Sequence, residues 1–456
     1  MSDVQQQYAL FNARITGDKM AGNAILVQNS VVELVLYESL EKAYLTGQVV
    51  IYDDTGIMDS IEFSGTEIFS VDIASETNDG SALQGLERTA SFSGGLPEGR
   101  SFTMTSIEKA IKSVNENGTS STYLITLKET HALLSDSMKI SRRIENNLND
   151  EIVKICGLDL KKDVDLSYSS PSVQGHFKGI IPYLHPLDAC EWLRDRATTN
   201  NGSPFFLYAS IHDLNIRFGN LDVMLDQPAF NKGRPYLNLP ANASKTENQG
   251  FLAKTFQVSS MSVTKVQNTH AQLKAGGIGS LYNNTNISTG QTTSVHFDVT
   301  TLIDKLKASD VIKSNTQQTV YDELFHINNV PVVDSNARIF HTITSHGTYG
   351  SFKSYHDEDT NEMFKKKVDN LAIRNMLYKN MFEVAVPGAG FIMSGASVGD
   401  IVSIATVADN ALAAEGGRQL DSFKSGSFLI YNTRHTFKGT RHDVVMTVCK
   451  LAKDKT

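Results

Sequence analysis

The residue types that could do chemistry gather most densely in one polar stretch, residues 341–359. It holds His341, His346, His356, Asp357, Glu358 and Asp359. Imidazole and carboxylate groups bind zinc and act as general acids and bases. Their spacing matches no known ligand motif, and a run such as His-Asp-Glu-Asp is equally typical of a solvated loop. We expect a surface loop here, and an enzyme with its site near 341–359 stays open as an alternative hypothesis.

Two glycine-rich runs resemble loops that hold phosphate groups, namely Gly276-Gly277-Ile278-Gly279 and Gly388-Ala389-Gly390. Neither is followed by Lys and Ser or Thr, and we expect neither to lie in a strand-to-helix turn, so flexible or positive-φ turns explain them better. Asp53 and Asp54 fall in a predicted β-turn, where Asp accepts local backbone hydrogen bonds, and this interpretation is preferred to metal binding.

Aromatic and basic residues give two further candidates for binding. Trp192, Phe205, Phe206 and Tyr208 could stack nucleic-acid bases, but no basic residue lies among the aromatic residues of 205–208. A packed core of a helix on a sheet is therefore predicted. The predicted helix 365–379 could contact an acidic partner, although a solvated face is the simpler interpretation; its basic residues are Lys365, Lys366, Lys367, Arg374 and Lys379.

Composition narrows the function further. A formal charge of −8 argues against a protein that binds nucleic acid by neutralising phosphates, although DNA could pass nearby without specific binding. Cys156, Cys190 and Cys449 form no CxxC pair, so we expect buried thiols and neither a disulfide framework nor a zinc site. We predict no catalytic, cofactor-binding or metal-binding residue, no cofactor, and no enzyme.

The sequence also shows no targeting signal. No run approaches the roughly 20 apolar residues of a transmembrane helix, so no membrane insertion is expected. The first residues lack the basic and apolar regions of a signal peptide, which predicts synthesis in the cytoplasm.

The first part of the chain, from residue 24, reads as short strands separated by turns. Strands are predicted at 31–37, 47–52, 68–73, 101–107 and 123–128, with Tyr123, Ile125 and Leu127 on one face of the last. This pattern favours an antiparallel sheet or barrel.

Helical periodicity begins after residue 130. One amphipathic helix ending near Gly157 is predicted from apolar residues four, four, four and three apart: Ile140, Ile144, Leu148, Ile152 and Ile155. A second helix begins at Pro186, and a strand at 205–209 is expected to pair with 215–218. Together these make a small α+β unit.

The rest of the chain is predicted to mix helices, strands and loops, and its C-terminal end is again rich in strands. Polar loops are expected at 226–250 and 276–296, a strand at 255–266, and helices at 302–308 and 362–380, with short strands at 330–333 and 339–343. Strands at 428–437 and 443–451 are joined by a predicted hairpin loop at 438–442, and Val444, Met446 and Val448 share one face.

The order of elements resembles that of the baseplate hub proteins of contractile-tailed bacteriophages, which are related to the hubs of type VI secretion spikes. The matching pieces are 181–193, 204–208, 382–388, 398–402 and 426–451, and more loosely 268–281. The resemblance implies a mainly β fold with α+β insertions, in which two tail-tube-like antiparallel β-barrel domains accompany a mixed middle domain and an inserted segment. The expected divisions are residues 1–130 for the first barrel domain, 131–214 for the α+β domain, 215–266 with 380–456 for a discontinuous second barrel domain, and 267–379 for the inserted or peripheral segment.

The same resemblance implies a structural virion protein without chemistry of its own. It would be a homotrimer in the phage tail baseplate that adapts a six-fold tail tube to a three-fold central spike, because a duplicated module lets three chains meet six. Its implied partners are the spike, tube and tape measure proteins and other baseplate subunits, and its channel would have a polar or acidic lining. A β-rich adhesin or carbohydrate-binding module stays open beside the enzyme as an alternative.

Overall fold

The computed structural model describes residues 8–17, 24–61, 63–74, 100–115, 118–144, 147–169, 179–231, 233–239, 255–265, 269–313, 315–319, 326–334, 336–344, 360–378, 380–408 and 420–454. The predicted loop residues 346 and 356–359 lie outside these ranges, as do all of residues 240–254.

The N-terminal strands form one antiparallel sheet that bends around its own core, here called the first rolled sheet. Its strands follow the order β3, β4, β7, β6, β5, β1, β2. They are β1 (Ala9–Thr16), β2 (Ile25–Leu26), β3 (Val31–Ser39), β4 (Thr46–Asp53), β5 (Ile68–Ala74), β6 (Arg100–Asn115) and β7 (Gly118–Glu129). The short 3-10 helix η2 (Gln28–Ser30) precedes β3, and helix α1 (Ile57–Ser60) follows β4.

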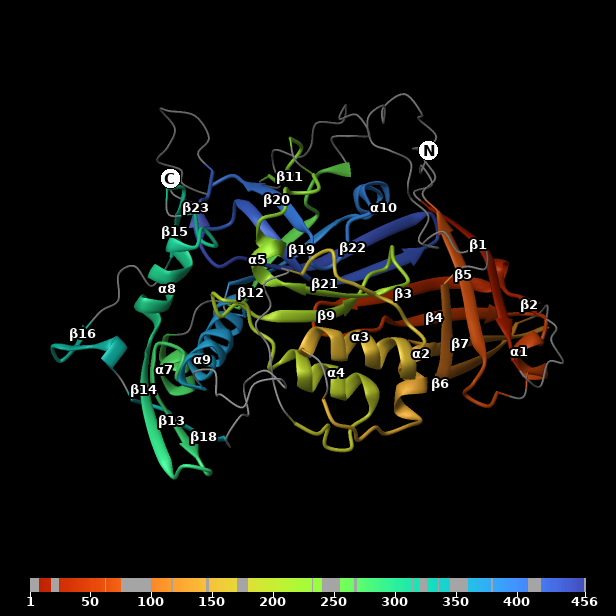
Figure 1. Ribbon diagram of the computed structural model, residues 1–456. Helices are drawn as coiled ribbons and strands as arrows, with labels where there is room; N and C mark the ends of the chain where they lie inside the picture. Colours follow the sequence, from red (N-terminus) through yellow and green to blue (C-terminus); the bar gives the residue numbers. More distant parts are fainter. Residues whose placement is uncertain are drawn as a thin grey trace, which may run out of the picture.

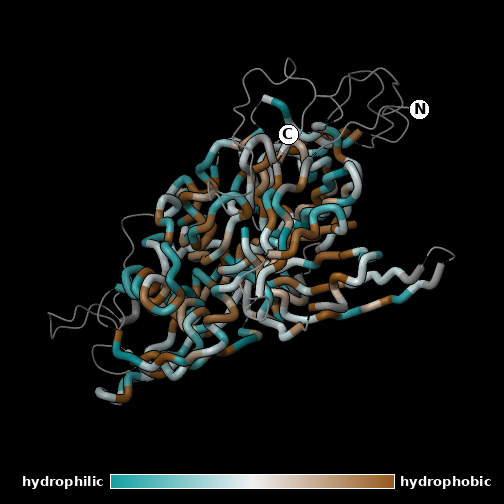
Figure 2. Tube along the Cα trace, turned by 90° about the vertical axis from the view of Figure 1, so that its right-hand side faces the viewer, coloured by the Kyte–Doolittle hydropathy of each residue, from teal (hydrophilic) through white to brown (hydrophobic). Residues whose placement is uncertain are grey.

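Alternation of apolar and polar residues fixes which face of this sheet is buried. Alternate residues of a strand point to opposite faces, so Leu34 and Leu36 of β3 point inward while Val35 and Tyr37 point outward. The predicted inward face of β7 is confirmed, since Tyr123, Ile125 and Leu127 are all buried in the same apolar cluster. Brown and teal segments alternate along the strands accordingly (Figure 2).

The second rolled sheet brings together strands that lie far apart in the sequence. It consists of β11 (Tyr236–Asn238), β12 (Ser260–Lys265), β19 (Met381–Pro387), β20 (Ile401–Thr406), β21 (Gly426–Lys438) and β22 (Arg441–Cys449). Around the ring, β21 pairs with β22, β22 with β19, β19 with β12, and β21 also with β20, which pairs with β11. Leu237 closes the ring, because its N–H donates to the Phe256 carbonyl at 2.8 Å and its carbonyl accepts from Val258 N–H at 2.9 Å.

The hairpin predicted at the C-terminal end is confirmed with a tighter turn than expected. Strands β21 and β22 stay paired as far as Lys438 and Arg441, which leaves Gly439 and Thr440 as a two-residue turn. Gly439 has φ of +60°, a conformation that a two-residue turn requires and glycine adopts without steric cost.

A single strand pair joins the two rolled sheets. β21 runs antiparallel to β3 from Asn432 opposite Ser39 to Lys438 opposite Glu33. The strands of both rolled sheets therefore belong to one hydrogen-bonded sheet, and the β3–β21 pair is called the seam below. Figure 1 shows the first rolled sheet at the right and, above the centre, the strands β19 to β22 of the second in blue.

A small α+β unit packs below the seam. Strands β8 (Val164–Asp165), β10 (Ile216–Asn220) and β9 (Phe205–Ala209) form its sheet, and the predicted pairing of 205–209 with 215–218 is confirmed. Helices α2 (Thr130–Asp136), α3 (Leu148–Asp159) and α4 (Pro186–Arg194) share its apolar core, which lies beneath β9 in Figure 1. Helix α5 (Leu221–Leu225) follows β10.

The predicted helix across residues 140–155 is wrong in its first half. Helix α3 begins only at Leu148, because Asn147 caps it by accepting the Asp150 N–H at 2.9 Å. Ile140 instead pairs with Leu184 in an isolated β-bridge, and Ile144 N–H donates to the Gly179 carbonyl. Both apolar side chains still contact the same core, which is why the spacing imitated one continuous helix.

The segment between the rolled-sheet strands forms an arm at the left of Figure 1. It contains α7 (Thr269–Ala275), β13 (Gly279–Asn286), β14 (Gln291–Asp298), α8 (Val299–Ala308), β18 (Ile339–Thr344) and α9 (Thr360–Leu377). The expected polar loop at 276–296 is wrong, because these residues form the β13–β14 hairpin. Their Asn, Thr and Ser side chains alternate between the faces of a paired ribbon, and composition alone does not distinguish that from a loop.

Short elements complete the described chain: β15 (Gln317–Gln318) with β23 (Lys453–Asp454), β16 (His326–Ile327) with β17 (Val330–Pro331), the 3-10 helix η3 (Val332–Asp334), and α10 (Ala389–Ser394). The predicted fold class, mainly β with α+β insertions, is confirmed. Within the described ranges, no helix is both long and apolar enough to cross a bilayer.

Candidate functional site

A continuous outward face crosses the seam and is the most extensive feature that both rolled sheets share. Seven neighbouring strands contribute to it, in the order β12, β19, β22, β21, β3, β4, β7. Register places Glu383 beside Thr447, Thr447 beside Asn432, and Asn432 beside Ser39. A second row runs through Val445, Arg434, Tyr37, Thr46 and Lys128.

The side chains on this face are mostly polar and carry charges of both signs. Both signs of charge are present, since Glu33, Glu383 and Asp443 lie among Lys128, Arg434, Lys438 and Arg441, and Lys438 pairs with Glu33 at 2.9 Å. This mixture of charges is not predominantly acidic. A surface of mixed charge presents weak net attraction or repulsion to a polyanion.

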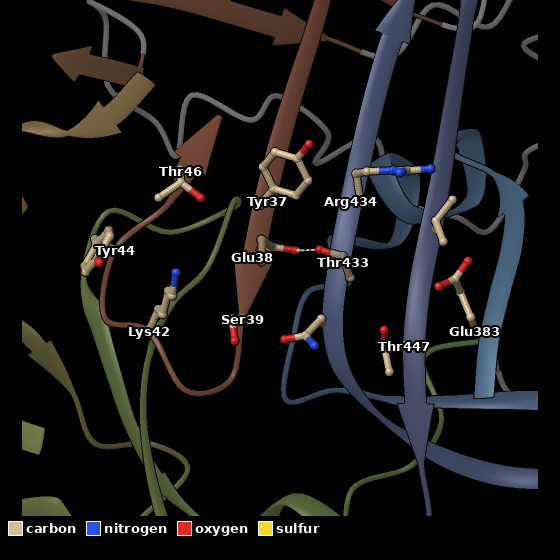
Figure 3. A pocket seen from close by; sticks show the side chains of 12 residues that line it. Tyr37, Glu38, Ser39, Lys42, Tyr44, Thr46, Glu383, Thr433, Arg434 and Thr447 are labelled. Atoms are coloured by element: carbon tan, nitrogen blue, oxygen red, sulfur yellow. Dashed lines mark hydrogen bonds between the residues drawn. The ribbon is translucent and has the colours of Figure 1, made fainter. Parts of the chain in front are cut away.

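A shallow hollow of about 410 Å³ opens on this face at the seam (Figure 3). The loop after β3 borders it with Lys42 and Tyr44, and the amino group of Lys128 lies 5.0 Å from the Tyr44 ring centroid. Glu383, Arg434 and the other labelled strand residues surround it from β3, β4, β19, β21 and β22.

Glu38 lies under this hollow and connects three units of the fold. It belongs to β3, and its Oε1 accepts the Ile211 N–H of the α+β unit at 2.6 Å and the Ser397 hydroxyl of the second rolled sheet at 2.6 Å. Its Oε2 accepts the Thr433 hydroxyl and lies 3.3 Å from His435 Nε2, both on β21. Burial alone would raise the pKa of Glu38, but the hydrogen bond and charge of His435 and the two hydroxyl donors lower it to about 2.

Three histidines, His435, His442 and His212, lie in or beside this buried network. His435 Nδ1 lies 3.2 Å from His442 Nε2, and the His442 ring stacks on Phe437 with centroids 4.2 Å apart. Burial lowers the pKa of His442 well below its ordinary value, and the neighbouring histidines lower it further. His212 Nε2 lies 2.9 Å from the Ala396 carbonyl, and burial lowers the pKa of His212 to about 4.

Glu41, just after β3, is a second carboxylate shared among units. It pairs with Arg194 of α4 at 3.0 Å and Arg374 of α9 at 2.9 Å, and it accepts the hydroxyls of Tyr378 at 2.9 Å and Tyr431 at 2.6 Å. Burial opposes its ionisation, but the two guanidinium groups outweigh burial and lower the pKa of Glu41. Residues 38–41 therefore hold the seam, the α+β unit and the arm together.

The polar cluster predicted at 341–359 is described only at His341. Its side chain is exposed on β18 opposite Asn283 of β13, and the other five candidates lie outside the described residues. In the described part of the chain, no three His, Cys, Asp or Glu side chains converge as a metal would require.

The two glycine runs serve close packing and turning. Gly276 has φ of +76° directly after α7, as predicted for a positive-φ turn. The expectation for the second run is wrong in two respects, because Gly388 does lie in a turn from β19 to α10, and its φ is −76°. Glycine is required there because a Cβ would approach His442 Nδ1 to 2.0 Å.

The other candidates mostly have structural roles. Asp53 accepts hydrogen bonds from the backbone N–H groups of Thr55, Ile57 and Met58, which confirms its interpretation as a turn residue. Phe205, Phe206 and Tyr208 are fully buried, which confirms the predicted core. Trp192 is partly buried, and Arg196 lies over its ring at 3.8 Å, a basic neighbour that the sequence analysis missed.

The basic helix also differs from expectation at one position. Helix α9 is present, but Arg374 points inward to Glu41 and donates to the Phe205 carbonyl at 2.5 Å instead of forming part of a solvated face. The long spacing between Glu41 and Arg374 left no local signal for this pair.

Sequence analysis also missed the seam network, although one signal was present. His442 is in phase with Val444, Met446 and Val448, which the alternation had assigned to one face, so its inward position could have been inferred. A bulge between Ile430 and Asn432 shifts the phase of β21, which concealed the inward position of His435.

The sequence matches no protein-family model, and no curated protein matches it. Solved structures do share its fold. A tail protein from Neisseria meningitidis MC58 superposes with a TM-score of 0.51 at 10% identity, over 97% of this chain and 97% of that one. The predicted resemblance to phage tail proteins is thereby confirmed for the fold.

Two further structures are similar at lower TM-scores. The 43 kDa tail protein of prophage MuSo2 from Shewanella oneidensis gives 0.48 at 11% identity, over 96% of this chain and 98% of that one. An E. coli component of the type VI secretion system gives 0.39 at 11% identity, over 92% of this chain and 73% of that one.

Proposed function

We propose that this chain is a structural component of a phage-type tail, the central hub of a contractile-tail baseplate. The observation that carries the proposal is the single polar face that runs across two rolled sheets joined at the seam. One chain then presents two neighbouring modules side by side. Three such chains supply six modules, which is the arithmetic needed to join a six-fold tube to a three-fold spike.

The polar face is proposed as the lining of the channel in that ring. It carries charges of both signs, with Lys438 paired to Glu33, so DNA could pass without being held. The partners in this proposal are two further copies of the chain, the spike, tube and tape measure proteins, and other baseplate subunits. The protein would thus belong to the virion and perform no catalysis.

The domain division stays part of the proposal. Residues 1–130 and the pair 215–266 with 380–456 would be the two tube-like modules, 131–214 the α+β domain, and 267–379 a peripheral insertion. The fold shared with the Neisseria tail protein supports this arrangement, since it extends over nearly all of both chains.

Electron microscopy tests the proposal directly. The chain would be purified alone and after coexpression with tail tube and spike proteins, and mass photometry would give the stoichiometry. We expect three chains in a hollow six-lobed ring with Tyr37 and Arg434 facing the lumen. A monomer under both conditions, or a ring with this face turned outward, would contradict the proposal.

A further inference from the structure

Two cysteines that are distant in sequence meet in the core of the α+β unit. Cys156 of α3 and Cys190 of α4 have their sulfur atoms 3.8 Å apart, and both side chains are fully buried. Cys449 is also buried, but it lies on β22 in a different apolar cluster. All three are free thiols.

We propose that Cys156 and Cys190 are a latent redox pair, which hydrogen peroxide converts into a disulfide that joins α3 to α4. In a reducing cytoplasm the thiols would stay free, and in an oxidising medium the cross-link would form. The proposal is independent of the proposed function, because it concerns only the α+β unit.

The geometry favours this pair over any other. A disulfide bond is about 2.05 Å long, so the sulfur atoms need to approach by less than the width of one methyl group, which small rotations of the two side chains can supply. The helices that carry them already pack together through Ile152, Ile155, Leu187 and Leu193. The bond would close a loop between residues 34 apart in sequence, long enough to constrain the unfolded chain appreciably.

The chemistry balances in two steps. One thiolate attacks a peroxide oxygen, the O–O bond breaks, and after proton transfer a sulfenic acid and one water are formed. The second thiol sulfur then attacks the sulfenic sulfur, the S–O bond breaks, and the leaving hydroxide takes the thiol proton as a second water. Two thiols are oxidised, and one peroxide is reduced for each disulfide.

Burial sets the rate of this reaction. Burial and the neighbouring Cys156 raise the pKa of Cys190 well above its ordinary value, so little thiolate is present in the closed core. The first step therefore requires transient opening between α3 and α4, and we expect oxidation over hours. The intramolecular second step needs no further encounter between chains.

Oxidation would also act on the joint between units. Helix α4 carries Arg194, which pairs with Glu41 after β3. Fixing α4 to α3 limits the movement of that arginine away from the carboxylate. We therefore expect the oxidised protein to resist unfolding of the α+β unit better than the reduced protein.

The test is peroxide treatment of the native full chain, followed by thiol counting under denaturing conditions and non-reducing peptide mass spectrometry. We expect free thiols to fall from three to one, a linked Cys156–Cys190 peptide, intact Cys449, and a higher thermal midpoint that dithiothreitol reverses. The Cys449→Ala variant should form the same link, with its free thiols falling from two to none, while Cys156→Ala and Cys190→Ala should each form no intramolecular link. Three free thiols after prolonged oxidation, sulfonic acids without a link, or disulfides only between chains would each overturn the proposal.

Discussion

Replacing Glu38 by glutamine tests whether one buried carboxylate stabilises the meeting point of three units. The folded protein keeps the pKa of Glu38 near 2, against an ordinary value of 4.5. At 1.36 kcal/mol for each pKa unit, that difference corresponds to about 3 kcal/mol of stability at neutral pH. The amide keeps the size of the side chain but removes the charge that His435 and the hydroxyl donors stabilise. Glu38→Gln should therefore lose most of this free energy of unfolding.

The assay is urea unfolding at pH 7 followed by circular dichroism, with Glu33→Gln as the matched control on the same strand. Glu33 pairs with Lys438 at the surface, where such a pair contributes at most about 1 kcal/mol. Because the folded pKa of Glu38 is lowered, its contribution is complete above pH 4.5 and disappears as the pH falls toward 2. The difference in unfolding free energy between wild type and Glu38→Gln should become smaller over that interval. Equal stability of Glu38→Gln and Glu33→Gln at pH 7 would refute this account.

Three further predictions concern the same network and its surroundings. The pKa of His212 is about 4 in the folded protein and 6.5 ordinarily, so between these pH values the unfolded chain binds a proton that the folded chain excludes. The stability of wild type relative to His212→Gln should therefore fall as the pH is lowered from 6.5 to 4. Thermal melting across that range measures this change. Gly388→Ala would place a Cβ 2.0 Å from the His442 ring and should cost about 1–3 kcal/mol in urea unfolding, whereas Gly157→Ala, with open space around it inside α3, should be neutral or stabilising. Arg374→Ala leaves Glu41 with one guanidinium partner and should lower the free energy of unfolding by about 2–4 kcal/mol. The control Lys128→Ala removes an exposed pair and should lower it by at most about 1 kcal/mol. Similar unfolding midpoints for the two variants would contradict a shared joint at Glu41.

The sequence was sufficient for elements whose signals are local. The alternation in 123–128 located β7 and its buried face, and Pro186 marked the start of α4. In both cases one short segment contains the whole pattern, so periodicity or a helix-start residue is enough.

Long-range contacts explain most of what could not be predicted. Glu38 reaches Ser397 across 359 residues, and Glu41 reaches Arg374 across 333. No periodicity connects residues so far apart, and a glutamate in a strand looks like any exposed one. Ile140 shows the opposite error, because its spacing from Ile144 imitated a helix although tertiary packing places it in a β-bridge.

The seam also has a consequence for how the chain is made. Glu33 and Lys438 pair across 405 residues, and Phe437 of β21 belongs to the core of the first rolled sheet. During synthesis the first rolled sheet therefore stays incomplete until β21 leaves the ribosome. Until then the β3 edge is unpaired and the core position of Phe437 is empty. The α+β unit, whose contacts are mostly local, can form first, so the nascent chain should expose an adhesive strand edge for most of its translation.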